Sequence, residues 1–140
     1  MEAEKKINNP IDRDYGLKNV FIYWFPIVIY CFLIFIQSSY PSPKSVPDLP
    51  YIDKILHFSA YAILGALFFR AFKSLNRISN IKIIIFLSIL FSSLYGAGDE
   101  FHQYFVPYRT ADLMDALADI TGSFFGVYTY IFISSRFPVS

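Results

Sequence analysis

The chain has 140 residues, of which 55% are hydrophobic and 20% aromatic. Charged residues make up only 16%, against roughly a quarter in soluble domains, so a soluble protein of this length could not bury so much apolar surface. The formal charge of +1 at pH 7 argues against nucleic acid as the main partner. Length and composition together predict an integral membrane protein with one domain.

The first hydrophobic run follows a polar, charged stretch at residues 1–19, which we interpret as a cytoplasmic N-terminal tail. Residues 20–37 are almost uniformly apolar, and as a helix they would span about 27 Å, close to a bilayer core of about 30 Å. No small-residue cleavage site follows, so we expect an uncleaved signal anchor. Pro26 is expected to kink this helix.

Three more apolar runs follow. The proline-rich segment 38–52 is predicted to be an extended loop. The next runs cover residues 52–72, 81–98 with a helical continuation to Gln103, and 111–134, joined by a polar link and a turn at 104–110. The sequence therefore predicts an all-α polytopic membrane protein, a four-transmembrane-helix bundle at residues 20–134.

Lysine and arginine are distributed unequally between the two ends of these predicted helices. With the N-terminus inside, nine of the twelve lie on the inner side and only Lys44, Lys54 and Arg109 on the outer side. The positive-inside rule therefore predicts that both termini are cytoplasmic. Most of the acidic residues after the tail then gather at the extracytoplasmic face.

A polar stripe opens the second run. Asp53, His57 and Tyr61 are spaced by four, so they share one helical face, and Gly65 continues it one turn deeper. Amphipathicity alone can also produce such a stripe, and a single histidine is often a hydrogen-bonded packing residue.

The third run ends in a second polar group. Glu100 and Gln103 are three apart and are expected to lie together, whereas Asp99 is expected to be a solvated charge at the helix end. Arg109 follows in the turn, where it can bind carboxylates in bidentate fashion and neutralise the nearby aspartates.

The fourth run contains three acids on one face. Asp112, Asp115 and Asp119 follow i, i+3, i+7 spacing, and Gly122 and Gly126 extend that face as a GxxxG motif. Each acid costs about 2.5–3.5 kcal/mol at the bilayer centre, so such groups usually face the bundle interior and find partners there. Asp119 lies deepest and is the least solvated of the three.

The segments DKILHFSAYAILG, DEFHQYFVPYR and DLMDALADITGSFFG resemble the VanZ-like family of small bacterial membrane proteins, which is named for a teicoplanin-resistance protein. The residues on family positions are Asp53, Lys54, His57, Tyr61, Glu100, Gln103, Arg109, Asp112, Asp115 and Gly122. Asp119 stands where the family usually has Asn, which leaves the role of that position open.

The resemblance implies a multi-pass protein of the bacterial cytoplasmic membrane, active in cell-envelope biology or glycopeptide (teicoplanin) resistance. We interpret its polar residues as a pocket at the extracytoplasmic face for a lipid head group, a cell-wall precursor or a glycopeptide. The predicted ligand-binding residues are Asp53, His57, Tyr61, Glu100, Gln103, Arg109, Asp112, Asp115 and Asp119.

Several alternatives remain open at this point. An enzyme would use Glu100 or Asp115 as general base with His57 as its acid partner, although no Ser-His-Asp arrangement or lipid-phosphatase signature is present. Carboxylates with His57 could hold a divalent cation, but no clustered His/Cys pattern strengthens that interpretation. The chain could instead be an accessory subunit of another envelope enzyme or a small transporter, and its oligomeric state is open.

Overall fold

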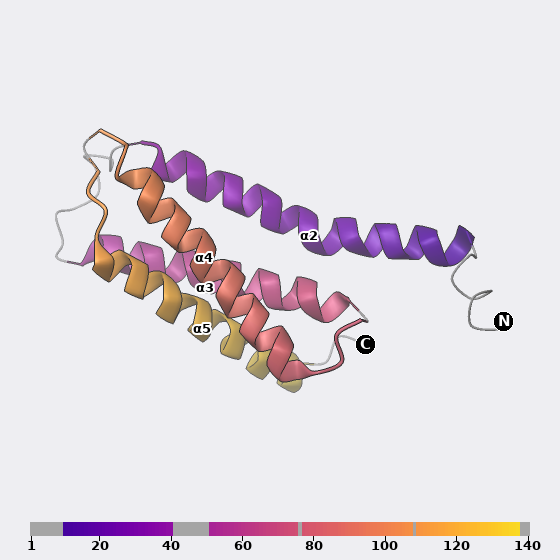
Figure 1. Cartoon of the computed structure of the whole chain (residues 1–140). Coiled ribbons are helices and arrows are strands. Elements are labelled where there is room, and N and C mark those ends of the chain that lie inside the picture. The colour runs from indigo at the N-terminus through magenta and orange to yellow at the C-terminus, as the bar shows by residue number, and fades with distance from the viewer. Residues whose placement is uncertain (1–9, 41–50, 76, 108, 138–140) are drawn as a thin grey trace.

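The computed structural model describes residues 10–40, 51–75, 77–107 and 109–137. This part of the chain forms four helices and no strand: α2 (Pro10–Ser38), α3 (Ile52–Ser74), α4 (Ile81–Gln103) and α5 (Leu113–Arg136). Figure 1 shows them running back and forth side by side. The expected all-α, four-helix architecture is confirmed. The predicted loop at 38–52 falls mostly outside the described residues.

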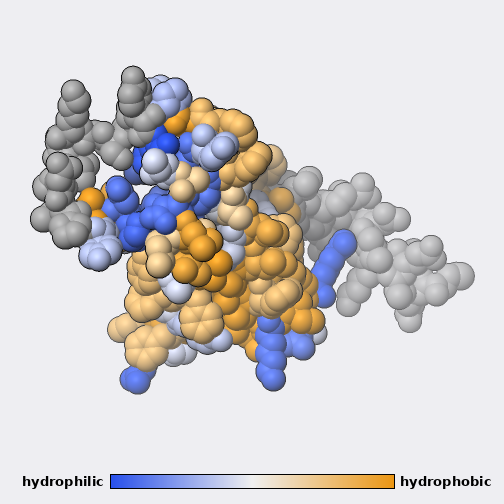
Figure 2. Space-filling view, turned by 60° about the vertical axis from the view of Figure 1, so that its left-hand side comes forward, coloured by the Kyte–Doolittle hydropathy of each residue, from blue (hydrophilic) through white to orange (hydrophobic). Residues whose placement is uncertain are grey.

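Each helix contains a stretch that is long and apolar enough to cross a membrane. Large apolar side chains point away from the bundle: Phe21, Phe86 and Phe132 are each more than 60% exposed. Figure 2 shows a broad hydrophobic band between two hydrophilic ends. Outward-facing aromatic residues at this density fit a lipid surrounding, so the chain is a multi-pass membrane protein.

Helix α2 begins ten residues before the expected hydrophobic run, so half of the predicted polar tail is helical. Pro10 is its first residue, a position where proline's missing N–H costs no helical hydrogen bond. Its N-terminal end projects beyond the other three helices (Figure 1). Further along, the ring of Trp24 packs edge-on against Phe68 and Phe72 of α3. These contacts attach α2 to one side of the bundle.

Helices α3 and α5 approach each other closely along a seam of glycines. A Cβ atom added to Gly65 would lie 2.6 Å from the carbonyl oxygen of Ser123. Cβ atoms at Gly122 and Gly126 would overlap the carbonyl groups of Phe58 and Ala62. The backbones therefore touch where side chains would normally separate them, as the GxxxG spacing predicted.

Buried serines join α4 to this pair. Ser92 and Ser123 are fully buried, and their hydroxyl oxygens lie 2.8 Å apart. The Ser123 hydroxyl also lies 2.7 Å from the carbonyl oxygen of Asp119 on its own helix. Small hydroxyl side chains thus satisfy each other and the backbone without separating the helices.

The chain direction brings four helix ends to one side of the membrane: the end of α2, the start of α3, the end of α4 and the start of α5. Hydrophilic side chains gather there in Figure 2. We call this the polar end. The opposite end carries Lys73, Arg77, Lys82 and Arg136, close to the other helix termini.

Candidate functional site

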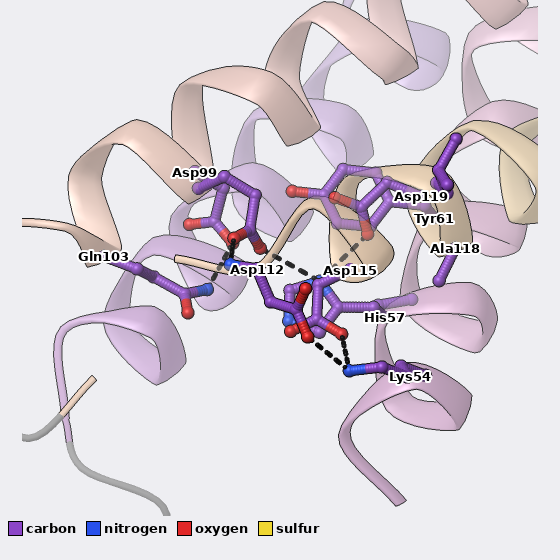
Figure 3. A network of polar contacts seen from close by, with 12 residues as sticks. Lys54, His57, Tyr61, Asp99, Gln103, Asp112, Asp115, Ala118 and Asp119 are labelled. Carbon is purple, nitrogen blue, oxygen red and sulfur yellow. Dashed lines mark hydrogen bonds and ion pairs between the residues drawn. The ribbon is translucent and has the colours of Figure 1, made fainter. Parts of the chain in front are cut away.

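Titratable side chains from three helices meet at the polar end, and Figure 3 shows His57 close to Asp119. His57 comes from α3, Glu100 from α4 and Asp119 from α5. The Nδ1 atom of His57 lies 2.9 Å from Asp119 Oδ1 and 3.7 Å from Glu100 Oε1. We call these residues the His57–Glu100–Asp119 cluster. All three were predicted site residues, and the structure brings them together from distant parts of the chain.

The cluster leaves polar atoms without partners. Glu100 Oε1 and Asp119 Oδ2 are buried and accept no hydrogen bond from any described residue. The side chains are 10% and 1% exposed. The hydroxyl of Tyr61, one turn below His57, is likewise buried without a partner. An unsatisfied buried polar group costs roughly 1–3 kcal/mol, so these atoms are expected to bind something else.

Lys54 forms ion pairs with two aspartates of the polar end. Its Nζ atom donates to Asp112 Oδ2 at 2.8 Å and to Asp115 Oδ1 at 3.0 Å. Asp53, which was predicted to share the face of His57, is exposed and makes no described hydrogen bond or ion pair. The helix therefore turns Lys54, three residues before His57, toward α5 in place of Asp53. The i, i+3 spacing of Lys54 and His57 was the sequence feature that could have predicted this orientation.

Asp112 connects the start of α5 to both neighbours. It is the N-cap, and its Oδ1 accepts from the backbone N–H of Met114 at 2.9 Å. Its own backbone N–H donates to Glu100 Oε2 at 3.0 Å. The ammonium of Lys54, followed by the Met114 N–H, holds the pKa of the Asp112 carboxyl below its ordinary value. Glu100 is thereby oriented by one oxygen while the other stays unpartnered.

Arg109 makes no ion pair with a carboxylate among the described residues, so its observed contacts differ from the expected neutralising role. Its Nε donates to the carbonyl oxygen of Tyr40 at 2.9 Å, and its Nη2 donates to that of Gln37 at 3.0 Å. These carbonyls lie at and just beyond the end of α2, where helical acceptors have no intrahelical donor and a cation favours the helix dipole. Arg109 thus attaches the α4–α5 turn to α2.

Asp99 was predicted to be a solvated charge, but the structure buries its side chain. It is only 6% exposed, and its Oδ2 accepts a hydrogen bond from Gln103 Nε2 at 3.2 Å. Gln103, expected beside Glu100, is therefore paired with Asp99 one turn away on α4. Tertiary burial of the end of α4 by the neighbouring helices overrides its location near a helix terminus.

A small pocket adjoins the cluster. The space open to the centre of a water-sized sphere is about 40 Å³, and one water needs roughly 10–15 Å³ of such space. The pocket therefore takes a few waters or one small polar group. Its lining residues are Ile34, Gln37, Ser38, Leu56, His57, Ala60, Tyr61, Asp99, Gln103 and Arg109.

The predicted site residues thus fall into separate groups. His57, Tyr61, Gln103 and Arg109 line the pocket. Glu100, Asp115 and Asp119 are buried beside it, and Asp112 caps α5 nearer the surface. Three polar residues of the pocket lining lay outside the predicted ligand-binding set: Gln37, Ser38 and Asp99. Ser38 follows the apolar run 20–37, which contains no acidic residue or histidine, and only the packing of α2 brings it here.

Comparison with known proteins supports a family assignment. The VanZ/LLP1 family model matches residues 13–134. A relative in Schizosaccharomyces pombe, named "Uncharacterized protein C11E3.10", is 31% identical over 96 residues, which cover 69% of this chain and 56% of the relative. The chain thus matches little more than half the length of that relative. No solved structure gives a significant match. The family match over most of the chain, with four membrane-length helices, shows that this protein belongs to the VanZ/LLP1 family.

Proposed function

We propose that the pocket at the polar end binds the head group of a membrane lipid or of a lipid-linked envelope precursor, at the extracytoplasmic membrane surface. The observation that carries this proposal is the buried Tyr61 hydroxyl, which has no partner among the described residues and whose side chain lines the pocket. The buried Ser38 hydroxyl lines the same pocket and is also unpartnered. A ligand with hydrogen-bonding groups would satisfy both.

The position of the pocket suits a head group. Its lining runs from the exposed Gln37 to Tyr61, which is only 1% exposed, so it leads from the surface into the bundle. Tyr61 lies nine residues after the start of α3, about 13 Å by helical rise. A lipid in the bilayer can present its polar end at this depth while its chains stay beside the apolar helix faces.

The size of the pocket limits the kind of chemical group that it can hold. With about 40 Å³ open to water-sized spheres, it accommodates a phosphate-sized or amine-sized group rather than a whole glycopeptide. We therefore propose that any effect on glycopeptide resistance acts through an envelope lipid or precursor.

The two residues predicted as general bases, Glu100 and Asp115, differ in their hydrogen-bond partners. Asp115 accepts a hydrogen bond from Lys54, which lowers its availability as a base. Glu100 keeps one unpartnered oxygen 3.7 Å from His57. Any acid–base chemistry on a bound head group would therefore use Glu100 and His57, with Asp115 as part of the ion-pair network.

The test compares two tyrosine variants. Detergent-purified protein is mixed with short-chain phosphatidic acid, phosphatidylglycerol, phosphatidylethanolamine or an undecaprenyl-linked precursor, and Tm and native mass spectra are recorded. We expect at least one lipid to raise the Tm of the wild type. Tyr61→Phe removes an unsatisfied hydroxyl, so it should keep or raise the ligand-free Tm yet lose most of the lipid-induced shift.

Tyr95→Phe is the matched control. The Tyr95 hydroxyl donates to the carbonyl oxygen of Cys31 at 2.6 Å, so its loss should cost about 0.5–1.5 kcal/mol of stability and leave the lipid-induced shift intact. A wild type that responds to none of these lipids contradicts the proposal, as does a Tyr61→Phe variant that responds like the wild type.

A further inference from the structure

We infer that the His57–Glu100–Asp119 cluster binds a divalent cation at the base of the pocket. Each residue offers one ligand atom, and these three atoms all lie within 4.8 Å of one another. The donors come from α3, α4 and α5, so a bound ion would join all three helices. The cation does not depend on the proposed head group, whereas any contact between the two rests on the proposed function.

The spacing of the donor atoms fits a common ion. Ligand atoms that bind one tetrahedral zinc at about 2.0–2.2 Å lie roughly 3.3–3.6 Å apart. The observed separations from His57 Nδ1 are 2.9 Å to Asp119 Oδ1 and 3.7 Å to Glu100 Oε1. Shifts of a few tenths of an ångström would bring both of these separations into that range, and the third pair of ligand atoms lies within 4.8 Å.

The unpartnered oxygens are a second, independent observation. Glu100 Oε1 and Asp119 Oδ2 are buried and lack hydrogen-bond donors among the described residues. Buried carboxylates are normally paired or coordinate a metal. Lys54 donates to Asp112 and Asp115, and Arg109 donates to backbone carbonyls. No described Lys or Arg therefore pairs with either carboxylate, and His57 is the single ionisable partner that the described residues offer to both. A divalent cation would supply the countercharge that one imidazole cannot give to two carboxylates.

The surroundings hold the carboxylates in place. The backbone N–H of Asp112 donates to Glu100 Oε2, which orients Glu100 and leaves Oε1 on the side of His57. A Cβ atom at Gly96 would lie 2.7 Å from Asp119 Oδ2, so the glycine allows α4 to pack directly against this carboxylate. Such outer contacts fix ligand geometry in metal sites.

The donor set indicates the kind of ion. One imidazole nitrogen and two carboxylate oxygens suit Zn²⁺ or Mn²⁺ better than Ca²⁺, which takes six to eight oxygen ligands. Three protein ligands leave a coordination position open, the arrangement of zinc sites that bind water or a substrate. His57 also lines the pocket. A phosphate oxygen in the pocket is thus the chemistry that would fill the open position.

The experiment uses metal ions alone. Full-length protein in detergent is treated with EDTA, dialysed and titrated with ZnCl₂, MnCl₂, MgCl₂ or CaCl₂, with calorimetry, elemental analysis and Tm as readouts. We expect about one equivalent of Zn²⁺ or Mn²⁺ to bind and raise the Tm. Asp119→Asn and Glu100→Gln each keep the shape of the side chain and should weaken binding by at least about ten-fold. Co²⁺ should give a visible absorption band that His57→Ala abolishes.

His102→Ala is the matched control, because it removes the other histidine of the chain, which lies outside the cluster with its Nε2 atom 3.0 Å from the Ser39 hydroxyl oxygen. Its affinity should match the wild type. Absence of binding at 1 mM metal, wild-type affinity in both carboxylate variants, or an equal loss in His102→Ala would each overturn the cation site. The lipid titration repeated in EDTA separates the two proposals, because a lipid response without metal supports the head-group site whatever the cation result.

Discussion

The glycine seam and the polar end both involve helices α3 and α5, but they differ in how fully their polar groups are paired. Along the seam, Gly65, Gly122 and Gly126 let backbones touch, and the hydroxyls of Ser92 and Ser123 satisfy each other or the main chain. At the polar end, one oxygen of Glu100, one oxygen of Asp119 and the Tyr61 hydroxyl are buried without a hydrogen-bond partner among the described residues.

This difference suggests separate roles for the two regions: the seam holds the helices together, and the polar end is available to bind a ligand. Close packing and satisfied serine hydroxyls are sufficient to associate membrane helices. Buried charges are weak evidence for stability, since apolar side chains of similar volume often replace them without loss. The polar end therefore has the properties of a binding region, and the seam those of the structural core that positions it.

The largest effect is expected at the seam. Gly126→Ala places a methyl group against the carbonyl group of Ala62, so α3 and α5 must separate, at a cost of about 1–3 kcal/mol. Gly98→Ala is the control, because nothing lies within 4 Å of a Cβ at that position. There alanine should be neutral or stabilising, by up to about 1 kcal/mol. Thermal unfolding in detergent measures both, and equal Tm values would contradict the seam as the core.

A smaller effect is expected when the polar end loses the ammonium group of Lys54. Lys54→Met leaves Asp115, whose side chain is 9% exposed, without its ion pair. Because the lysine itself is 29% exposed, solvent screens part of the cost, and we expect a loss of about 1–2 kcal/mol.

Lys73→Met, on an exposed position at the opposite end of α3, is the control and should change stability by less than about 0.5 kcal/mol. Adding Asp115→Asn to Lys54→Met should recover part of the lost Tm, since the uncompensated charge is gone. A double variant no more stable than Lys54→Met would refute the ion pair as the cause.

The smallest effect is expected in the dependence of stability on acidic pH. The pKa of Asp112 is lower in the folded protein than its ordinary value of 3.8 because of Lys54 and the Met114 N–H. Its stabilising contribution is therefore present above about pH 4 and is lost as the pH falls through the folded pKa. Asp112→Asn keeps an N-cap side chain but cannot titrate. We expect its Tm to fall less steeply than that of the wild type between pH 5 and pH 3, and parallel curves would argue against this contribution.

Much of the helical framework was predictable. The expected limits of α3, α4 and α5 agree with the observed ones to within two residues, because long apolar runs in lipid must be helical. Only the start of α2 was placed ten residues too late. It lies in polar sequence, where hydropathy carries no signal for a helix.

The site was predictable only in part. Spacing along one helix correctly grouped His57 with Tyr61 and Asp115 with Asp119, because helical geometry is local. It failed at Asp53, Asp99 and Arg109, whose partners lie on other helices or on backbone carbonyls. Residue types alone do not reveal which carbonyl oxygens are free or how far α3 is rotated about its axis.

The sequence by itself determined the membrane class, the four spans and the family, since these depend on composition, length and ordered motifs. Only the tertiary structure decided that Lys54 rather than Asp53 meets the aspartates of α5, and that His57, Glu100 and Asp119 converge while two carboxylate oxygens stay unpartnered. The physical reason is the glycine seam. It sets the rotation and closeness of α3 against α5, and that packing determines which side chains face one another.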